Sequence, residues 1–156
     1  MRITRYTTEL TDDKITAVVK ENSSNYEISN LNCPENIVRM MNDVFHAGRK
    51  AEEYVWLIAA NTKMKPIGLF ELTHGSVNAS QLGSREVFVR LCLLGASSFV
   101  VVHNHPSGDS SPSIDDNATT KRLKSAADIM GIPLVDHIII GDQRYVSFRE
   151  QGLLDE

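Results

Sequence analysis

The chain has 156 residues, of which 42% are hydrophobic and 23% are charged, and its formal net charge is −4. This length suits one domain that buries roughly 70% of the surface of the unfolded chain. The apolar content excludes a disordered chain, and the ordinary counts of glycine and proline exclude fibrous and low-complexity classes. The mild acidity gives no support to nucleic-acid binding, which usually requires a basic face.

The sequence also lacks the patterns of membrane and secreted proteins. No apolar run approaches the ~20 residues that a membrane span needs, and residues 1–10 have no signal-type hydrophobic stretch. Two cysteines, Cys33 and Cys92, are too few for a disulfide framework, and no C-x-x-C pair offers a thiolate metal site. We therefore expect a cytoplasmic, reduced, single-domain protein.

The first elements are expected in an N-terminal extension over residues 1–33, which packs as a hairpin on a domain over residues 34–156. Residues 15–20 (ITAVVK) predict a strand, and residues 21–25 (ENSSN) predict a turn. Pro34 then suits the first turn of a helix. Apolar residues recur at helical spacing as far as Phe45, and Gly48 indicates the helix end.

Strands and helices alternate from there on. Residues 54–60 and 67–72 predict a strand hairpin, and residues 84–94 predict a second helix with Cys92 on its inward face. Residues 99–102 (FVVV) are consecutively apolar, which is typical of a central strand covered on both faces. A third helix over 114–130 precedes two strands at 135–140 and 145–148. This order predicts an α/β sandwich around a mixed sheet.

The residues that carry chemistry follow the predicted central strand. In extended backbone the side chains of His103 and His105 point to the same face. Asp116 lies in the first turn of the third helix, from which its carboxylate can fold back toward them. Two histidines and one aspartate leave one position of a tetrahedral Zn²⁺ open, which is the arrangement of a catalytic zinc site.

Other interpretations of these residues stay open. A single histidine at a strand end is more often a hydrogen-bonded surface residue than a ligand. The string SIDD at residues 113–116 matches a capping box, which explains Ser113 and Asp116 as well as metal binding does. Both roles are compatible, because a capping serine fixes where the carboxylate points. Asp109 and Asp115 are rival ligands, and His137 is expected to be a structural histidine.

The pattern His103-x-His105-x₇-Ser113-x₂-Asp116 resembles the JAMM metalloprotease signature at every position. The string HNHPSG at residues 103–108 is similar to the hallmark of the RadC-type branch of the JAB/MPN family. SREVF at residues 84–88 resembles the P-R-E-[IV]-F helix start of that branch, with Ser84 in place of proline. DHIIIG at residues 136–141 resembles its closing strands, and the resemblance covers about residues 34–154.

This resemblance implies a fold and a set of roles. The fold is a JAB/MPN-like, cytidine-deaminase-like, three-layer α/β/α sandwich, and His103, His105 and Asp116 hold one Zn²⁺ per chain. The family's general base is a glutamate before a hydrophobic strand, and EYVWL at residues 53–57 resembles that segment, so the role falls to Glu53. Ser113 is expected to donate a hydrogen bond to the reacting carbonyl. The residues alone leave the base open among Glu53, Glu52 and Glu71.

Three functions are compatible with these observations. The first is a zinc-dependent hydrolase that acts on a peptide or isopeptide, and the complete set of ligands, base and serine favours it. The second is a binding module that retains zinc without catalysis. The third is a role in DNA repair or with a mobile element, as the RadC name suggests, which the net charge of −4 disfavours.

Overall fold

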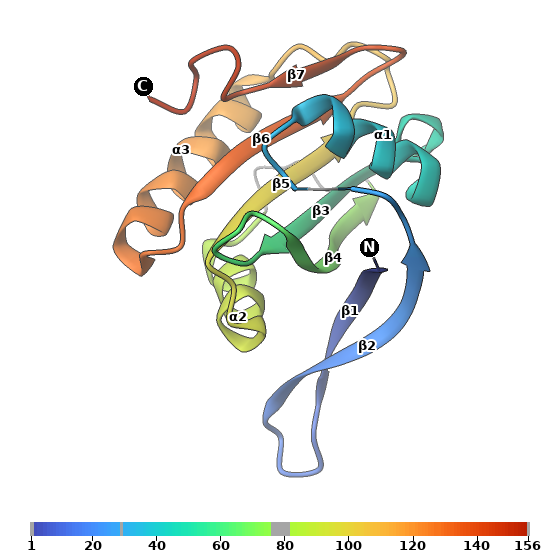
Figure 1. Ribbon diagram of the computed structural model, residues 1–156. Helices are drawn as coiled ribbons and strands as arrows, with labels where there is room; N and C mark the ends of the chain where they lie inside the picture. Colours follow the sequence, from blue (N-terminus) through green and yellow to red (C-terminus); the bar gives the residue numbers. More distant parts are fainter. Residues whose placement is uncertain (1, 29, 76–81, 156) are drawn as a thin grey trace.

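The computed structural model describes residues 2–28, 30–75 and 82–155. The elements are β1 (Arg2–Leu10), β2 (Thr16–Asn25), α1 (Pro34–Phe45), the 3₁₀ helix η1 (Ala47–Arg49), β3 (Glu53–Ala60), β4 (Pro66–Gly75), α2 (Ser84–Leu94), β5 (Ser98–Asn104), α3 (Ile114–Met130), β6 (Leu134–Ile140) and β7 (Tyr145–Ser147). Figure 1 shows their arrangement around one sheet.

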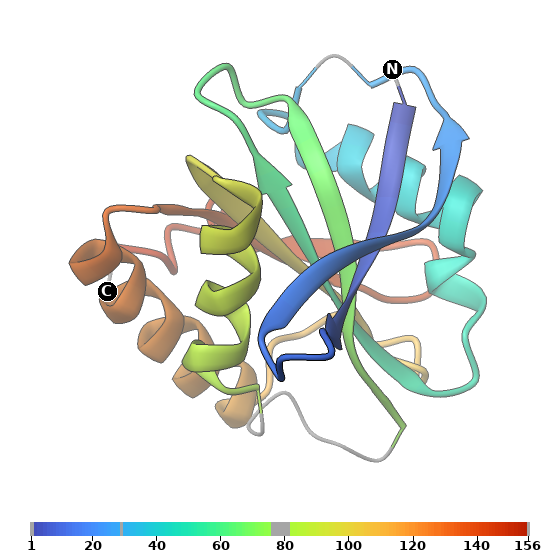
Figure 2. The same ribbon diagram turned by 90° about the horizontal axis from the view of Figure 1, so that it is seen from below.

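The sheet is mixed and has seven strands in the order β2-β1-β4-β3-β5-β6-β7. β5 lies antiparallel to β3 on one side and parallel to β6 on the other. Helices α2 and α3 cover one face of the sheet, and α1 covers the opposite face (Figure 2). The predicted three-layer α/β/α sandwich around a mixed sheet is therefore confirmed.

β5 lies in the middle of both hydrophobic cores. Its seven residues are all buried. Phe99 and Val101 pack in the core that includes α2 and α3, whereas Val100 and Val102 pack in the core that includes α1. Because side chains alternate between the two faces of a strand, a strand covered on both faces needs apolar residues at consecutive positions. This burial gives the site at the end of β5 a rigid base.

The helix ends are set by local hydrogen bonds. α3 ends at Met130, and the next residue, Gly131, has a left-handed φ of 67°, which glycine adopts without a steric penalty. α1 ends at Phe45 rather than near Gly48 as predicted. His46 takes the left-handed conformation there, and the side chain of Asn42 accepts a hydrogen bond from the Gly48 N–H at 2.8 Å. That bond stabilises a separate 3₁₀ turn after the helix.

The N-terminal strands β1 and β2 pair antiparallel, from Arg2 opposite Asn25 to Leu10 opposite Thr16. The pair joins the sheet through β1, which lies parallel to β4 (Figure 1). The predicted turn at residues 21–25 is wrong, because these residues continue β2. β2 is an edge strand of the sheet, so its polar residues remain in contact with water. The limit between an extension and a domain at residue 34 stays a prediction.

Cys92 is exposed, so the prediction that it faces inward is wrong. The buried stripe of α2 is narrow and consists of Val87, Phe88 and Leu91. Among the described residues, no helix is both long enough and apolar enough to cross a lipid bilayer.

Candidate metal centre

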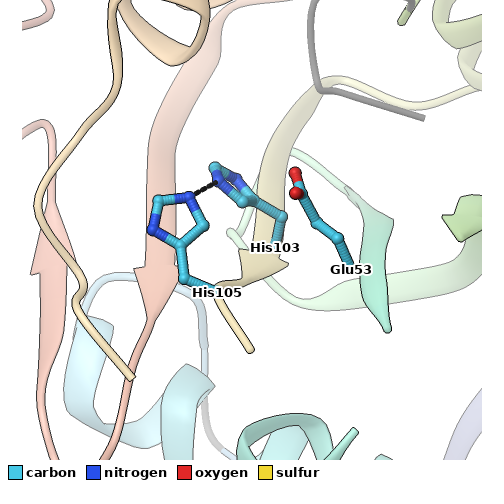
Figure 3. Close-up of side chains that lie close together, drawn as sticks. All are labelled: Glu53, His103 and His105. Carbon is cyan, nitrogen blue, oxygen red and sulfur yellow. Dashed lines mark hydrogen bonds between the residues drawn. The ribbon is translucent and has the colours of Figure 1, made fainter. Parts of the chain in front are cut away.

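The candidate site lies where β5 ends and β3 begins. His103 of β5 is paired with Val55 of the antiparallel strand β3. Two residues before Val55 therefore come next to two residues after His103, which brings Glu53 beside His105. Figure 3 shows the side chains of Glu53, His103 and His105 pointing toward one another.

Two imidazoles and one carboxylate meet within hydrogen-bonding distance. Nε2 of His103 and Nε2 of His105 are 3.0 Å apart. The Asp116 carboxylate lies 3.2 Å from Nε2 of His103 and 3.3 Å from Nε2 of His105. The side chains of His103 and Asp116 are 0% and 3% exposed, whereas that of His105 is 16% exposed, so the group opens to solvent on the His105 side.

The first turn of α3 fixes the direction of the Asp116 carboxylate. Ser113 Oγ accepts a hydrogen bond from the Asp116 N–H at 3.0 Å, and the Ser113 N–H donates to Asp116 Oδ2 at 2.7 Å. This reciprocal pair is the capping box that the sequence predicts. The other carboxylate oxygen, Oδ1, faces His103. The cap and the contacts with the two histidines therefore coexist.

Glu53 provides a second carboxylate at the same place. Ligand atoms of Glu53, His103 and His105 all lie within 4.8 Å of one another, so these three residues could hold a metal ion. Both Glu53 and Asp116 are thus near the two imidazoles. The assignment of Asp116 as the ligand and Glu53 as the base stays a prediction.

The rival residues lie elsewhere or point away. Asp109 and Asp115 are exposed, and Oδ1 of Asp109 accepts a hydrogen bond from the Ser111 N–H. The carboxylate of Glu71 is paired with Arg5 at 2.8 Å and with His74 at 3.1 Å. The structure therefore brings Glu53 and Asp116 to the two histidines and engages Glu71 in a separate ion-pair group.

Charge and burial in the site shift three ionisation equilibria. A hydrogen bond with Asp116 raises the pKa of His105, against the opposing effect of burial. Burial alone would raise the pKa of Asp116, but its close contacts with the imidazoles of His103 and His105 outweigh burial and hold that pKa well below its usual value. Burial lowers the pKa of His137, which lies behind His103, well below its usual value. The site therefore combines an ionised aspartate with a neutral buried imidazole.

The donor set fits a cation. His105 Nδ1 lies 2.7 Å from the main-chain oxygen of Asp109. Because a carbonyl oxygen only accepts, Nδ1 carries the proton, and a neutral His105 presents the lone pair of Nε2. This lone pair is directed at His103 and at the Asp116 carboxylate, so electron-rich groups converge on one point. Imidazole and carboxylate are ligands of zinc, and the residues present therefore fit such an ion.

Sequence reasoning gave no role to Asn104 and Thr120. Asn104 Oδ1 accepts from the Tyr54 N–H at 2.7 Å, and Nδ2 donates to the main-chain oxygen of Glu52 at 2.9 Å. Thr120 Oγ1 lies 2.5 Å from His137 Nδ1. The alternation of side chains indicates that Asn104 faces away from the two histidines, but its partners Glu52 and Tyr54 could not be inferred without the sheet register.

The fold and the site together define an α/β domain of the JAB/MPN type with a candidate metal centre of two histidines and a carboxylate. Residues 31–153 match the RadC-like JAB domain. The chain belongs to this family.

The most similar relatives include three bacterial proteins that carry the name UPF0758 protein. That of Pelobacter propionicus is 42% identical over 118 residues, which are 74% of this chain and 52% of the relative. That of Clostridium acetobutylicum is 46% identical over 103 residues, 66% of this chain and 45% of the relative. That of Thermotoga maritima is 46% identical over 102 residues, which are 65% of this chain and 46% of the relative. The chain therefore spans about half the length of the relatives it matches.

Proposed function

We propose that this protein is a zinc-dependent hydrolase of an amide bond, acting on a peptide or an isopeptide. The observation that carries the proposal is the convergence of His103, His105 and Asp116 beside the carboxylate of Glu53. His103, His105 and Asp116 would hold one Zn²⁺ per chain. Three protein ligands leave a coordination position open, which hydrolysis requires and a purely structural zinc site does not.

A bound Zn²⁺ would supply Lewis-acid activation of water near neutral pH. Glu53 would accept a proton from the attacking water and return it to the leaving nitrogen of the amide. The position of Glu53 supports this role, because it lies at the start of β3 on the half-open side of the site, next to His105. It is close to the two imidazoles and still reachable by a substrate.

Ser113 would donate a hydrogen bond from its hydroxyl group to the oxyanion that develops on the substrate carbonyl. Its oxygen accepts the capping hydrogen bond from the Asp116 N–H through a lone pair, so the proton itself remains available for donation. The same contact keeps the serine next to the carboxylate that faces the histidines. Ser113 is exposed, which a group that touches a substrate requires.

Metal analysis of the purified protein, combined with a hydrolysis screen over peptides and isopeptides, tests this function. The decisive variant is Glu53→Gln, which we expect to keep its zinc content and its fold while losing nearly all hydrolysis. Glu52→Gln is the matched control, because Glu52 is the exposed neighbour in the chain, and it should keep its turnover.

Two results would contradict the proposal. Near-normal turnover in Glu53→Gln would exclude Glu53 as the base, and loss of zinc in that variant would make Glu53 a ligand. Zinc binding without hydrolysis of any substrate in a broad panel would favour a binding module that retains its metal.

A further inference from the structure

A buried hydrogen-bonded chain lies behind His103. Nδ1 of His103 is 2.8 Å from Nε2 of His137 on the adjacent strand β6. Nδ1 of His137 is 2.5 Å from Oγ1 of Thr120 on α3, and this oxygen is 2.7 Å from the main-chain oxygen of Asp116. This series of hydrogen bonds therefore starts at His103, a proposed ligand, and passes through residues of β6 and α3. It ends on the main-chain oxygen of Asp116, another proposed ligand.

The direction of every hydrogen bond in this chain follows from its last member. The carbonyl oxygen of Asp116 can only accept, so the Thr120 hydroxyl donates its proton there. Thr120 Oγ1 must then accept from His137, which places the proton of a neutral His137 on Nδ1. Nε2 of His137 is left as an acceptor, and His103 donates to it from Nδ1. The lone pair of His103 consequently lies on Nε2, the atom that faces His105 and the Asp116 carboxylate.

Packing holds this series of hydrogen bonds in one arrangement. His137 is 1% exposed and Thr120 is 3% exposed. The ring of Phe148 stacks on His137 with centroids 4.7 Å apart and planes inclined by 16°. The main-chain N–H of His137 donates a hydrogen bond to the buried carboxylate of Asp136 at 2.8 Å, which fixes the backbone of β6 at this point. The ring of His137 thus has a single orientation and two specific hydrogen-bond partners.

We propose that Thr120 and His137 are positioning residues, which hold His103 in the tautomer that carries its proton on Nδ1 and so keep Nε2 free for a metal ion. The inference rests on the proposed metal site and extends it to residues that touch neither metal nor substrate. A ligating histidine is oriented by the hydrogen bond of its other ring nitrogen, and loss of such support usually weakens metal affinity. Here the hydrogen bonds of His137 and Thr120 also connect His103 to Asp116, because the Thr120 hydroxyl donates to the main-chain oxygen of Asp116.

The test uses the 156-residue chain labelled with ¹⁵N in its histidine side chains. Nitrogen spectra at about pH 8, where an ordinary histidine is neutral, show which ring atom carries the proton. In both the metal-free and the zinc-loaded wild type we expect a protonated Nδ1 on His103. An unprotonated Nδ1 on His103 would overturn the inference without any variant.

Three variants separate positioning from simple stability. Thr120→Val keeps the volume but removes the hydroxyl, and we expect it to lose the single tautomer and to bind zinc about ten-fold more weakly in competition with a chelator. Thr120→Ser should restore the wild-type spectrum and affinity. Ser98→Ala is the control, because it removes another buried hydroxyl bond, from Ser98 Oγ to Met64 Sδ at 3.4 Å, at the end of β5 far from His103. It should lower the melting temperature while leaving spectrum and affinity unchanged.

The outcomes distinguish this inference from the proposed function. Wild-type affinity and spectrum in Thr120→Val, or equal losses in Ser98→Ala, would show that Thr120 has no positioning role. If the wild type binds no zinc, the proposed function fails, and the tautomer in the metal-free spectra still decides whether Thr120 and His137 position His103.

Discussion

Asn104 holds Glu53 in place by binding the main chain on both sides of it. The side-chain amide accepts a hydrogen bond from the residue after Glu53 and donates one to the residue before it. Asn104 is 2% exposed and lies between the two histidines in the chain. One residue of β5 thus fixes the distance between the proposed ligands and the proposed base.

Replacing this amide should impair catalysis more than metal binding. We expect Asn104→Ala to keep its zinc and to lose turnover by about 10²-fold, because a small displacement of a catalytic group is costly. Unmet buried hydrogen bonds should also lower the free energy of unfolding by about 1–3 kcal/mol. Metal analysis, kinetics and denaturant titration measure the three effects. Asn42→Ala, which removes another amide bound to the backbone, should keep its turnover; equal turnover in the two variants would exclude the role of Asn104.

The ligand assignment predicts about one zinc per chain, with three protein ligands, the number typical of catalytic zinc sites. His103→Ala and Asp116→Ala should each reduce zinc affinity strongly, because each removes a donor atom from the buried side of the centre. Asp109→Ala serves as the control, since its exposed carboxylate points into its own loop. The assignment is wrong if Asp109→Ala abolishes zinc binding and Asp116→Ala does not.

Removal of the Ser113 hydroxyl should separate catalysis from zinc binding. Ser113→Ala should lose turnover by ~10²–10³-fold, the usual effect of deleting one oxyanion donor. Loss of the helix cap should lower stability by ~1 kcal/mol. Ser113→Thr restores both a cap and a hydroxyl and should recover most of both quantities. An alanine variant that is destabilised but fully active would limit Ser113 to its capping role.

Zinc affinity should fall as the pH decreases. The pKa of His105 is raised above its usual value by its hydrogen bond with Asp116, and a protonated imidazole cannot bind a metal ion. Protons therefore compete with zinc below this raised pKa, and affinity levels off above it. Competition titrations between about pH 5.5 and 8.5 bracket the transition. A constant affinity over this range would exclude His105 as a ligand.

DNA affinity should be weak or absent. The net charge of −4 and the small number of clustered cations provide little counterion release. The main basic group consists of Lys121, Arg122 and Lys124 on α3, and Arg122 already donates to the main-chain oxygen of Leu82. Duplex binding in the micromolar range or tighter at physiological salt, lost when the three cations are neutralised, would overturn this expectation.

The features predicted correctly are those that a short run of residues specifies by itself. The FVVV run indicated a strand covered on both faces, and β5 is buried throughout. The spacing of Ser113 and Asp116 predicted a capping box that the structure contains. The choice of Glu53 depended on a family resemblance, because the pairing of β3 with β5 that brings it to His105 is not encoded in the local sequence.

The wrong predictions concern residues whose conformation or burial depends on neighbours in space rather than on the local sequence. Residues 21–25 are polar and favour a turn by composition, but pairing with β1 extends them as an edge strand. Cys92 falls near an apolar stripe, yet the buried face of α2 is narrower than its periodicity suggests. His137 is structural in the sense predicted, and its contact with His103 depends on the parallel pairing of β5 and β6.

The proposed ligands come from one continuous strand–loop–helix segment over residues 103–116, whereas Glu53 and His137 come from distant parts of the chain. Contacts between residues close in sequence cost little loop entropy and form early in folding, and distant strand pairings form later. We therefore expect the ability to capture a metal to arise before the ability to use it. In the proposed hydrolase, an incompletely folded chain would hold the ion without cleaving itself or neighbouring chains, because Glu53, the proposed base, reaches the centre only when β3 has paired with β5.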